Sequence, residues 1–131
     1  MNRVVIGIGS NIDPQANVRA AVEAIAAGHR LLAESAFVQT EAIGRPHDPP
    51  FLNGAVLIET QMDADALKRW LRELEAQLGR RRGPDRCAPR TIDLDIVVLN
   101  GEIVDWAVRE RDFLRTAVRE VLGDVVPDDP S

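Results

Sequence analysis

The segment from Arg80 to Asp95 concentrates residues that could bind a charged ligand. Its first eleven residues hold five arginines and one aspartate, a local charge of +4 in a chain whose formal net charge is −5. Guanidinium groups grip phosphate oxygens through bidentate, charge-assisted hydrogen bonds. The contrast in charge therefore predicts a local site for an anionic ligand.

Two carboxylates follow the arginines in the same segment. Asp93 and Asp95 lie in a run whose alternate residues, Ile92, Leu94 and Ile96, are apolar. This alternation is typical of a half-buried strand, in which residues two apart point to one face. Neighbouring carboxylates repel each other, and Mg²⁺ is commonly held by one or two carboxylates together with substrate phosphates. The pattern predicts a magnesium site and favours phosphoryl or diphosphoryl transfer.

Simpler interpretations of the same residue types stay open at this point. An arginine run is usually a solvated surface, and an Asp-x-Asp pair on an exposed strand often serves only solubility. His47 fits a surface histidine better than a base, and Phe51 fits core packing as well as stacking on a flat ring. Asn53 is either a satisfied structural amide or a group that reads a heterocycle edge by donating and accepting at once. The arginines and the acidic pair favour function because they occur together.

Composition indicates one globular domain over residues 1–131, with a frayed tail after about residue 123. A pI near 5.0 argues against a general nucleic-acid or membrane binder. Cys87 is the single cysteine, which excludes an internal disulfide and a cysteine-based metal cluster. The sequence shows no signal peptide and no apolar run long enough to cross a bilayer, so a cytoplasmic protein is expected.

The hydrophobic pattern predicts a chain that mixes strands and helices. The expected elements are a strand at 4–9 leading into Gly9-Ser10-Asn11, a helix from an N-cap at Asp13 to Gly28, a strand at 31–40, a loop at 41–50, a strand at 51–60, a helix at 63–79 capped by Asp63, the Asp-x-Asp strand, a hairpin turn at Asn100-Gly101 with a partner strand at 102–104, and a helix at about 109–122. This order fits an α+β sandwich with a mostly antiparallel sheet and helices on one face. The other face would hold Asp93, Asp95 and the ligand.

Several short motifs together resemble one enzyme family. The motifs are Gly9-Ser10-Asn11, Phe51-Leu52-Asn53, Leu74-Glu75 with Gly79-Arg80, and Pro89-Arg90-Thr91-Ile92-Asp93-Leu94-Asp95-Ile96. They are similar to those of the 6-hydroxymethyl-7,8-dihydropterin pyrophosphokinases, and the likeness runs from residue 4 to about residue 104. The resemblance implies a ferredoxin-like α+β fold. It also implies transfer of the β,γ-diphosphate of ATP to the hydroxymethyl group of the pterin, with release of AMP, in folate or related pterin cofactor biosynthesis.

The resemblance also implies roles for individual residues. Asp93 and Asp95 would hold two Mg²⁺ ions, and these aspartates would form the catalytic set together with Arg80 and Arg90. ATP would be bound by Glu75, Arg80, Arg82, Arg90, Ile96 and Arg111, and the pterin by Thr40, Ile43, Phe51, Asn53 and Phe113. The loops at 41–50 and 79–89 would close over the substrates.

The sequence departs from the family pattern in two places. Only the six residues from Asp105 to Glu110 separate Val104 from Arg111, so the family's Pro-His element that contacts ATP has no counterpart. Cys87 stands where the family has an aromatic residue. Two alternatives therefore stay open: a diverged homologue that binds a pterin or nucleotide without this transfer, or a non-enzymatic ferredoxin-like interaction module. The expected partners are the pterin and ATP, with neither nucleic acid nor membrane.

Overall fold

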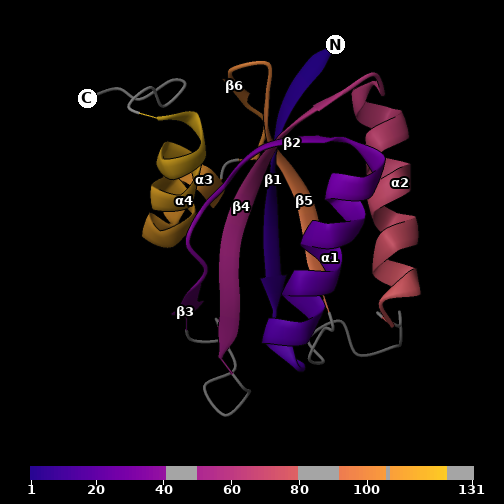
Figure 1. Cartoon of the computed structure of the whole chain (residues 1–131). Coiled ribbons are helices and arrows are strands. Elements are labelled where there is room, and N and C mark those ends of the chain that lie inside the picture. Colours follow the sequence, from indigo (N-terminus) through magenta and orange to yellow (C-terminus); the bar gives the residue numbers. More distant parts are fainter. Residues whose placement is uncertain (41–49, 80–91, 106, 124–131) are drawn as a thin grey trace.

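The computed structural model describes residues 1–40, 50–79, 92–105 and 107–123. A six-stranded sheet runs through these residues in the order β2-β4-β1-β5-β6, with β3 also paired to β4, and every pairing is antiparallel. The elements are β1 (Asn2–Ser10), α1 (Pro14–Gly28), β2 (Arg30–Glu34), β3 (Val38–Thr40), β4 (Phe51–Thr60), α2 (Ala64–Gln77), β5 (Asp93–Leu99), β6 (Glu102–Ile103), α3 (Ala107–Glu110) and α4 (Asp112–Leu122) (Figure 1). The α+β class and the mostly antiparallel sheet are as predicted.

Strand β1 lies at the centre of the sheet. It pairs with β4 over nine positions, from Asn2 opposite Thr60 to Ser10 opposite Leu52. On its other side it pairs with β5, up to Gly9 opposite Asp93. Central position explains its burial, because a strand flanked on both sides and covered on both faces meets little water. The strand that carries Asn53 and the strand that carries the aspartates are therefore both neighbours of β1.

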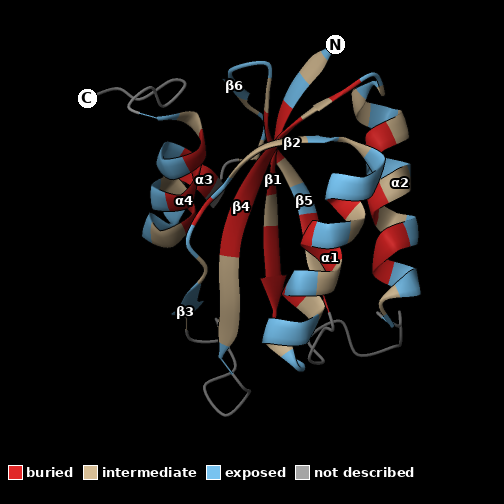
Figure 2. Cartoon of the chain, in the orientation of Figure 1, coloured by how far each residue is buried: buried red, intermediate tan, exposed pale blue. Residues whose placement is uncertain are grey.

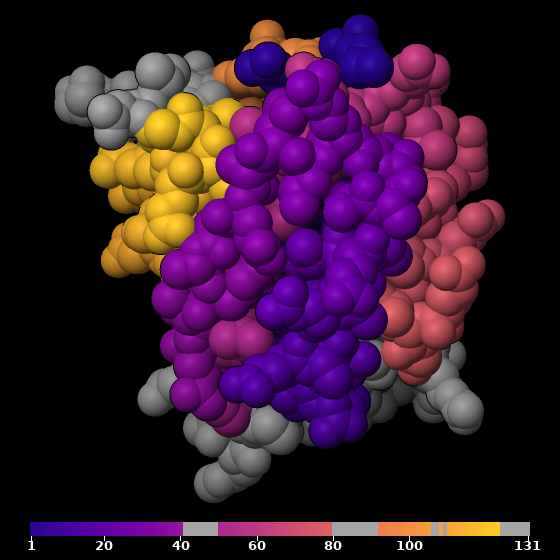
Figure 3. Space-filling model, viewed as in Figure 1, coloured from indigo at the N-terminus to yellow at the C-terminus, as the bar shows by residue number. Residues whose placement is uncertain are grey.

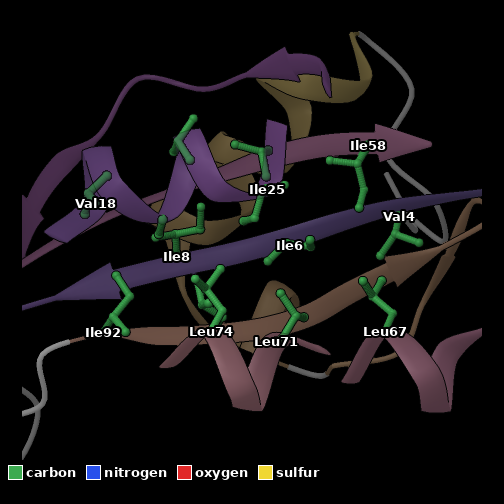
Figure 4. Close-up of a cluster of buried hydrophobic side chains, with 14 residues drawn as sticks. Val4, Ile6, Ile8, Val18, Ile25, Ile58, Leu67, Leu71, Leu74 and Ile92 are labelled. Atoms are coloured by element: carbon green, nitrogen blue, oxygen red, sulfur yellow. The ribbon is translucent and has the colours of Figure 1, made fainter. Parts of the chain in front are cut away.

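Helices α1 and α2 cover one face of the sheet, which we call the first face. Val4, Ile6 and Ile8 of β1 point into a core that also contains Ile25 of α1 and Leu71 of α2 (Figure 4). Apolar residues recur along α2 at a spacing of three to four, so the helix presents one apolar side to the sheet. Its N-terminus is capped by Asp63, whose carboxylate accepts a hydrogen bond of 2.8 Å from Ala66 N–H.

Helix α4 covers part of the opposite, second face, so the structure differs from the expectation of helices on one face. The apolar stripe of α4 packs against Val5, Leu57 and Val97 of the sheet. These strand residues make the part of the second face beneath α4 apolar. Apolar surface is stabilised when it is removed from water, so this part of the sheet needs a covering helix. Figure 2 shows buried residues on α4 as well as on α1 and α2, and Figure 3 shows α4 and α2 at opposite sides of the molecule.

The predicted strand at 31–40 is two strands in the structure. The buried residue Ser35 follows the end of β2: its N–H donates to Ala55 O, and its hydroxyl accepts from Ala55 N–H at 2.8 Å. The chain then turns Phe37 toward Gly54, where a Cβ atom would lie only 2.5 Å from the Phe37 ring. The Ser35 hydroxyl takes the place of a backbone carbonyl as the acceptor for Ala55 N–H, so the strand is interrupted there, and β3 resumes the pairing with β4.

Two further elements differ in detail from the prediction. Asp13 precedes α1 in the left-handed conformation, with φ of 41°, and its side chain makes no capping hydrogen bond. Asn17 instead donates its side-chain amide to Ile12 O. The segment predicted as one helix at 109–122 divides into α3 and α4, with Arg111 between them in an extended conformation. No helix in the described part of the chain is long and apolar enough to span a membrane.

His29 lies where α1 ends, against the sheet and α2. Its Nδ1 is 2.9 Å from Thr60 Oγ, and its ring meets the Trp70 ring edge to face at a centroid distance of 4.4 Å. Its Nε2 is buried without a hydrogen-bond partner among the described residues. Burial lowers the pKa of His29, because a charged imidazolium would lose hydration there.

We predict that the free energy of unfolding falls as the pH is lowered below about 6.5, the ordinary histidine pKa. Below this pH the unfolded chain binds a proton at His29 that the folded chain does not. The contribution of His29 to the free energy of unfolding is therefore fully present above pH 6.5 and is lost as the pH falls toward the lower pKa of the folded state. Denaturant unfolding at pH 7.5 and pH 5.5 measures the effect. The His29→Gln variant should show a smaller loss between the two pH values, and an equal loss in both proteins would contradict the assignment.

Candidate functional site

Two glycines of β1 form the floor of the candidate site. Gly9 lies between Asn53 of β4 and Asp93 of β5, and Gly7 lies between Ala55 and Asp95 in the next row. Directly opposed residues of a sheet point to the same face, here the second face that α4 partly covers. Neighbouring strands lie about 4.8 Å apart, so the Cα atoms of Asn53 and Asp93 are about 10 Å apart. We call Gly7 and Gly9 the glycine floor.

Asn53 is oriented by a neighbour on β3. Its Nδ2 donates to Thr40 Oγ at 2.5 Å, which uses one of the two amide protons. A Cβ atom on Gly9 would lie 2.6 Å from Asn53 Oδ1, so the absence of a side chain at position 9 makes room for the amide. Within the described residues, the Asn53 amide is left with one N–H donor and one carbonyl acceptor, the pair needed to bind the edge of a heterocycle.

Two half-buried aromatic residues belong to elements that border this region, and Phe113 also packs against the core beneath α4. Phe51 lies beside the floor, since a Cβ atom on Gly9 would be 3.8 Å from its ring. Phe113 belongs to the first turn of α4, next to Leu114, whose side chain would lie 3.6 Å from a Cβ atom on Gly7. The N-terminal end of α4, with Arg111 and Phe113, is therefore near the floor. The structure brings these predicted residues to one end of the second face.

Asp93 and Asp95 share the second face, as the alternation predicted. Asp93 is half-buried, and the Asp95 side chain is 52% exposed. Within the described residues no group of three or more His, Cys, Asp or Glu side chains could hold a metal ion. Carboxylate oxygens of this kind fit Mg²⁺, which keeps several waters and shares its remaining positions with substrate phosphates.

Glu75, predicted to bind ATP, has a structural partner in β5. It is almost fully buried, and its Oε2 accepts the Leu94 N–H at 2.8 Å. Its Oε1 accepts from Arg72 at 2.7 Å. Leu94 lies between the two aspartates, so Glu75 fixes the backbone that carries both of them. Arg72 is a residue of this region that sequence reasoning did not single out, although its spacing of three residues from Glu75 is typical of a helical ion pair.

Ile96, the other described residue predicted to contact ATP, points away from the aspartates. It is half-buried beside the core of the first face and pairs with Ile6 of β1. The remaining predicted site residues, Ile43, Arg80, Arg82 and Arg90, lie outside the described residues, as do most of the two loops predicted to close.

A separate hollow of about 480 Å³ lies on the second face at the far end of α4. Arg3, Glu59 and Leu122 are among its lining residues, whereas the predicted site residues are not. Arg3 and Glu59 already form an ion pair of 3.3 Å. The hollow therefore offers no free charge from this pair for a phosphate ligand and is not the candidate site.

The chain is similar in sequence to one protein family and to several named proteins. The family model described as 7,8-dihydro-6-hydroxymethylpterin-pyrophosphokinase (HPPK) matches residues 5–123. A Methylorubrum extorquens protein named 2-amino-4-hydroxy-6-hydroxymethyldihydropteridine pyrophosphokinase is 37% identical over 137 residues, covering 96% of this chain and 86% of its own length. Proteins of the same name from Haemophilus influenzae and Bacillus subtilis are 29% and 35% identical, covering 92% and 80% of this chain and 82% and 65% of their own lengths.

The relatives are named as pyrophosphokinases, the enzyme class that the sequence motifs predicted. The family match extends through β1, β4, β5 and α4, the elements that carry the described part of the candidate site. The predicted resemblance is confirmed: the chain belongs to the 7,8-dihydro-6-hydroxymethylpterin-pyrophosphokinase family.

Proposed function

We propose that this chain catalyses the Mg²⁺-dependent transfer of diphosphate from ATP to 6-hydroxymethyl-7,8-dihydropterin, releasing AMP, in folate or related pterin cofactor biosynthesis. One observation carries the proposal. Asn53, Gly9 and Asp93 form a row across three adjacent strands, so an amide suited to a heterocycle and a carboxylate suited to a cation flank one glycine. A flat ring and a chain of phosphates could then lie side by side over the glycine floor.

The pterin half of the site is built from Thr40, Phe51, Asn53 and Phe113. Asn53 would donate one N–H and accept one hydrogen bond at the pterin edge, and the bond to Thr40 keeps the amide in that orientation. Phe51 and Phe113 supply aromatic surface for stacking on the ring. A few fixed polar groups within an aromatic setting are typical of sites that bind small flat ligands.

The transfer itself exchanges one P–O bond for another. The hydroxymethyl oxygen attacks the β-phosphorus of ATP, the bond from that phosphorus to the oxygen shared with the α-phosphorus breaks, and AMP leaves with the electron pair. The hydroxyl proton is released as the new bond forms. Such transfer depends chiefly on positioning and on stabilising phosphate charge.

Asp93 and Asp95 would hold the metal, with Asp95 exposed and Asp93 half-buried. When bound there, Mg²⁺ supplies positive charge that screens the phosphates and favours ionisation of the attacking hydroxyl. The pairing of Asp93 with Gly9 and of Asp95 with Gly7 holds both carboxylates on the side of the sheet that carries Asn53. Arg80, Arg82 and Arg90 would add charge around the phosphates, as the family motif implies, and two metal ions are expected.

The direct test is incubation with ATP, Mg²⁺ and 6-hydroxymethyl-7,8-dihydropterin, followed by chromatographic separation of AMP from ADP. We expect AMP to form only when the pterin is present, together with equal amounts of pterin diphosphate. Formation of ADP, or of AMP at the same rate without pterin, would contradict the proposed transfer.

We expect Asp95→Asn to lower the turnover number by more than about 100-fold. Even residues that only hydrogen-bond to a metal ligand typically contribute about 10–100-fold to metal affinity or activity, and a ligand itself should contribute more. The substitution keeps the shape of the side chain and removes its charge. Asp65→Asn on the exposed first turn of α2 removes the same charge away from the site and should keep nearly full turnover. Turnover by Asp95→Asn at the level of this control would exclude Asp95 as a metal ligand.

We expect Asn53→Ala to weaken pterin binding about tenfold or more, because truncation leaves polar groups of the bound pterin unpaired. ATP binding should change by less than about twofold. Calorimetric titration of each ligand separates the two effects, and equal losses for pterin and ATP would argue against a role in reading the pterin.

Gly9→Ala provides a matched test of the same contact. The added Cβ would displace Asn53 Oδ1, from which it would lie only 2.6 Å, so pterin binding should weaken here too. In the Asn53→Ala background the amide is already gone, so Gly9→Ala should cost less, because only the effect of the new Cβ on the ligand itself is left. A double-mutant cycle measures this coupling, and strictly additive losses would mean that the two residues act independently.

A further inference from the structure

The outer edge of β5 is held by two side chains of α2 rather than by a full strand. β6 pairs only with Val98 and Leu99, at the far end of β5 from the aspartates. At Leu94, Glu75 Oε2 accepts the N–H at 2.8 Å and Arg72 Nη1 donates to the C=O at 3.1 Å. Both backbone groups of Leu94 are therefore satisfied by one helix.

Arg72 also contacts the acidic pair directly. Its Nη2 donates to Asp95 Oδ1 at 3.2 Å, while Nη1 donates to Glu75 Oε1 at 2.7 Å. The planar guanidinium thus joins a carboxylate of α2, the backbone of β5 and a carboxylate of the candidate metal site. The N–H donors of a planar guanidinium point in fixed directions, so Arg72 can orient its three acceptors as well as balance their charge. A single ammonium group supplies the charge but not the fixed directions.

The charges around this contact leave Asp95 suited to bind a cation. Glu75 is almost fully buried and carries a charge opposite to that of Arg72, so the two side chains together add no net charge beside the aspartates. Desolvation acts to lower the pKa of Arg72, but the hydrogen bond and charge of Glu75, and then those of Asp95, raise it overall, so the guanidinium stays protonated. The Asp95 side chain remains 52% exposed while it contacts Arg72 through Oδ1.

We propose that Arg72 is a positioning residue for the metal site: with Glu75 as its charge partner, it holds the carboxylate of Asp95 and the Leu94 backbone in the geometry that a divalent cation needs. The inference rests on the proposed role of Asp93 and Asp95 as metal ligands. Groups that orient a ligating carboxylate typically contribute about 10–100-fold to metal affinity.

A purely electrostatic effect of Arg72 would act in the opposite direction. A positive charge 3.2 Å from a carboxylate oxygen competes with a cation, so its removal would strengthen metal binding. A purely structural role would lower the melting temperature and leave the affinity of the folded protein for metal unchanged. Measuring metal affinity and thermal stability in the same variants therefore separates these two roles from positioning.

The key variant is Arg72→Lys, and Mn²⁺ alone is the probe. Lysine keeps a cation for Glu75, so the variant should fold, but one ammonium group cannot reproduce the planar fork to Glu75, Leu94 and Asp95. Arg72→Gln removes the charge as well. Arg69→Gln makes the same change three residues earlier on α2 at an exposed position and serves as the control. The electron paramagnetic resonance signal of free Mn²⁺ gives the dissociation constant at a temperature at which all four proteins are folded.

We expect Arg72→Lys and Arg72→Gln to raise the Mn²⁺ dissociation constant about tenfold or more, and Arg69→Gln to leave it within about twofold of the wild-type value. Wild-type affinity in either Arg72 variant, or tighter binding in Arg72→Gln, would overturn the inference. A wild-type protein that leaves the Mn²⁺ signal unchanged would overturn it together with the assignment of Asp93 and Asp95 to the metal. Pterin-dependent formation of AMP would still decide the proposed transfer separately.

Discussion

The position of β1 between β4 and β5 is the constraint on which the candidate site depends. Because β1 pairs with both strands, Gly9 stands in one row with Asn53 and Asp93. A shift of either pairing by one residue would turn Asn53 or the aspartates to the first face, among the core residues beneath α1 and α2. The same pairing buries Val4, Ile6 and Ile8 on that face, so the apolar core and the site fix the register together.

A local irregularity of β5 keeps the aspartates on the correct face. The register of β5 against β1 shifts between Val5 and Ile6, so both Val97 and Val98 face the core beneath α4. Such a bulge changes which residues share a face on its two sides. It allows β5 to present apolar residues to α4 at one end and carboxylates to the glycine floor at the other. At the outer edge of β5, side chains of helix α2 form hydrogen bonds with both the N–H and the C=O of Leu94.

Local sequence pattern predicted the elements whose partners are near in sequence or set by periodicity. The alternation around Asp93 and Asp95 correctly put both carboxylates on one face, and Asp63 and the Asn100-Gly101 turn are in the predicted roles. Asp13 is not a side-chain cap: its backbone is left-handed, whereas a capping residue usually has extended backbone angles. The roles of the site residues in binding and catalysis remain predictions.

Features that depend on distant partners were not visible in the sequence. Ser35 interrupts a strand through Ala55, 20 residues away, and Arg72 reaches Leu94 and Asp95 across 22 and 23 residues. The apolar stripe of α4 predicted a buried helix, but amphipathicity alone does not say which face of a sheet a helix covers. Placing α4 required the apolar residues of the second face, which the bulge in β5 helps to bring together.

Pterin and metal are proposed to bind side by side over the glycine floor. Paramagnetic relaxation of the protons of bound 6-hydroxymethyl-7,8-dihydropterin by Mn²⁺, in the presence of a non-hydrolysable ATP analogue, tests this claim most directly. The strand spacing predicts strong relaxation that corresponds to a separation on the order of 10 Å, and Asp95→Asn should weaken it. Saturating pterin whose protons relax no faster with Mn²⁺ than with Mg²⁺ would contradict the account.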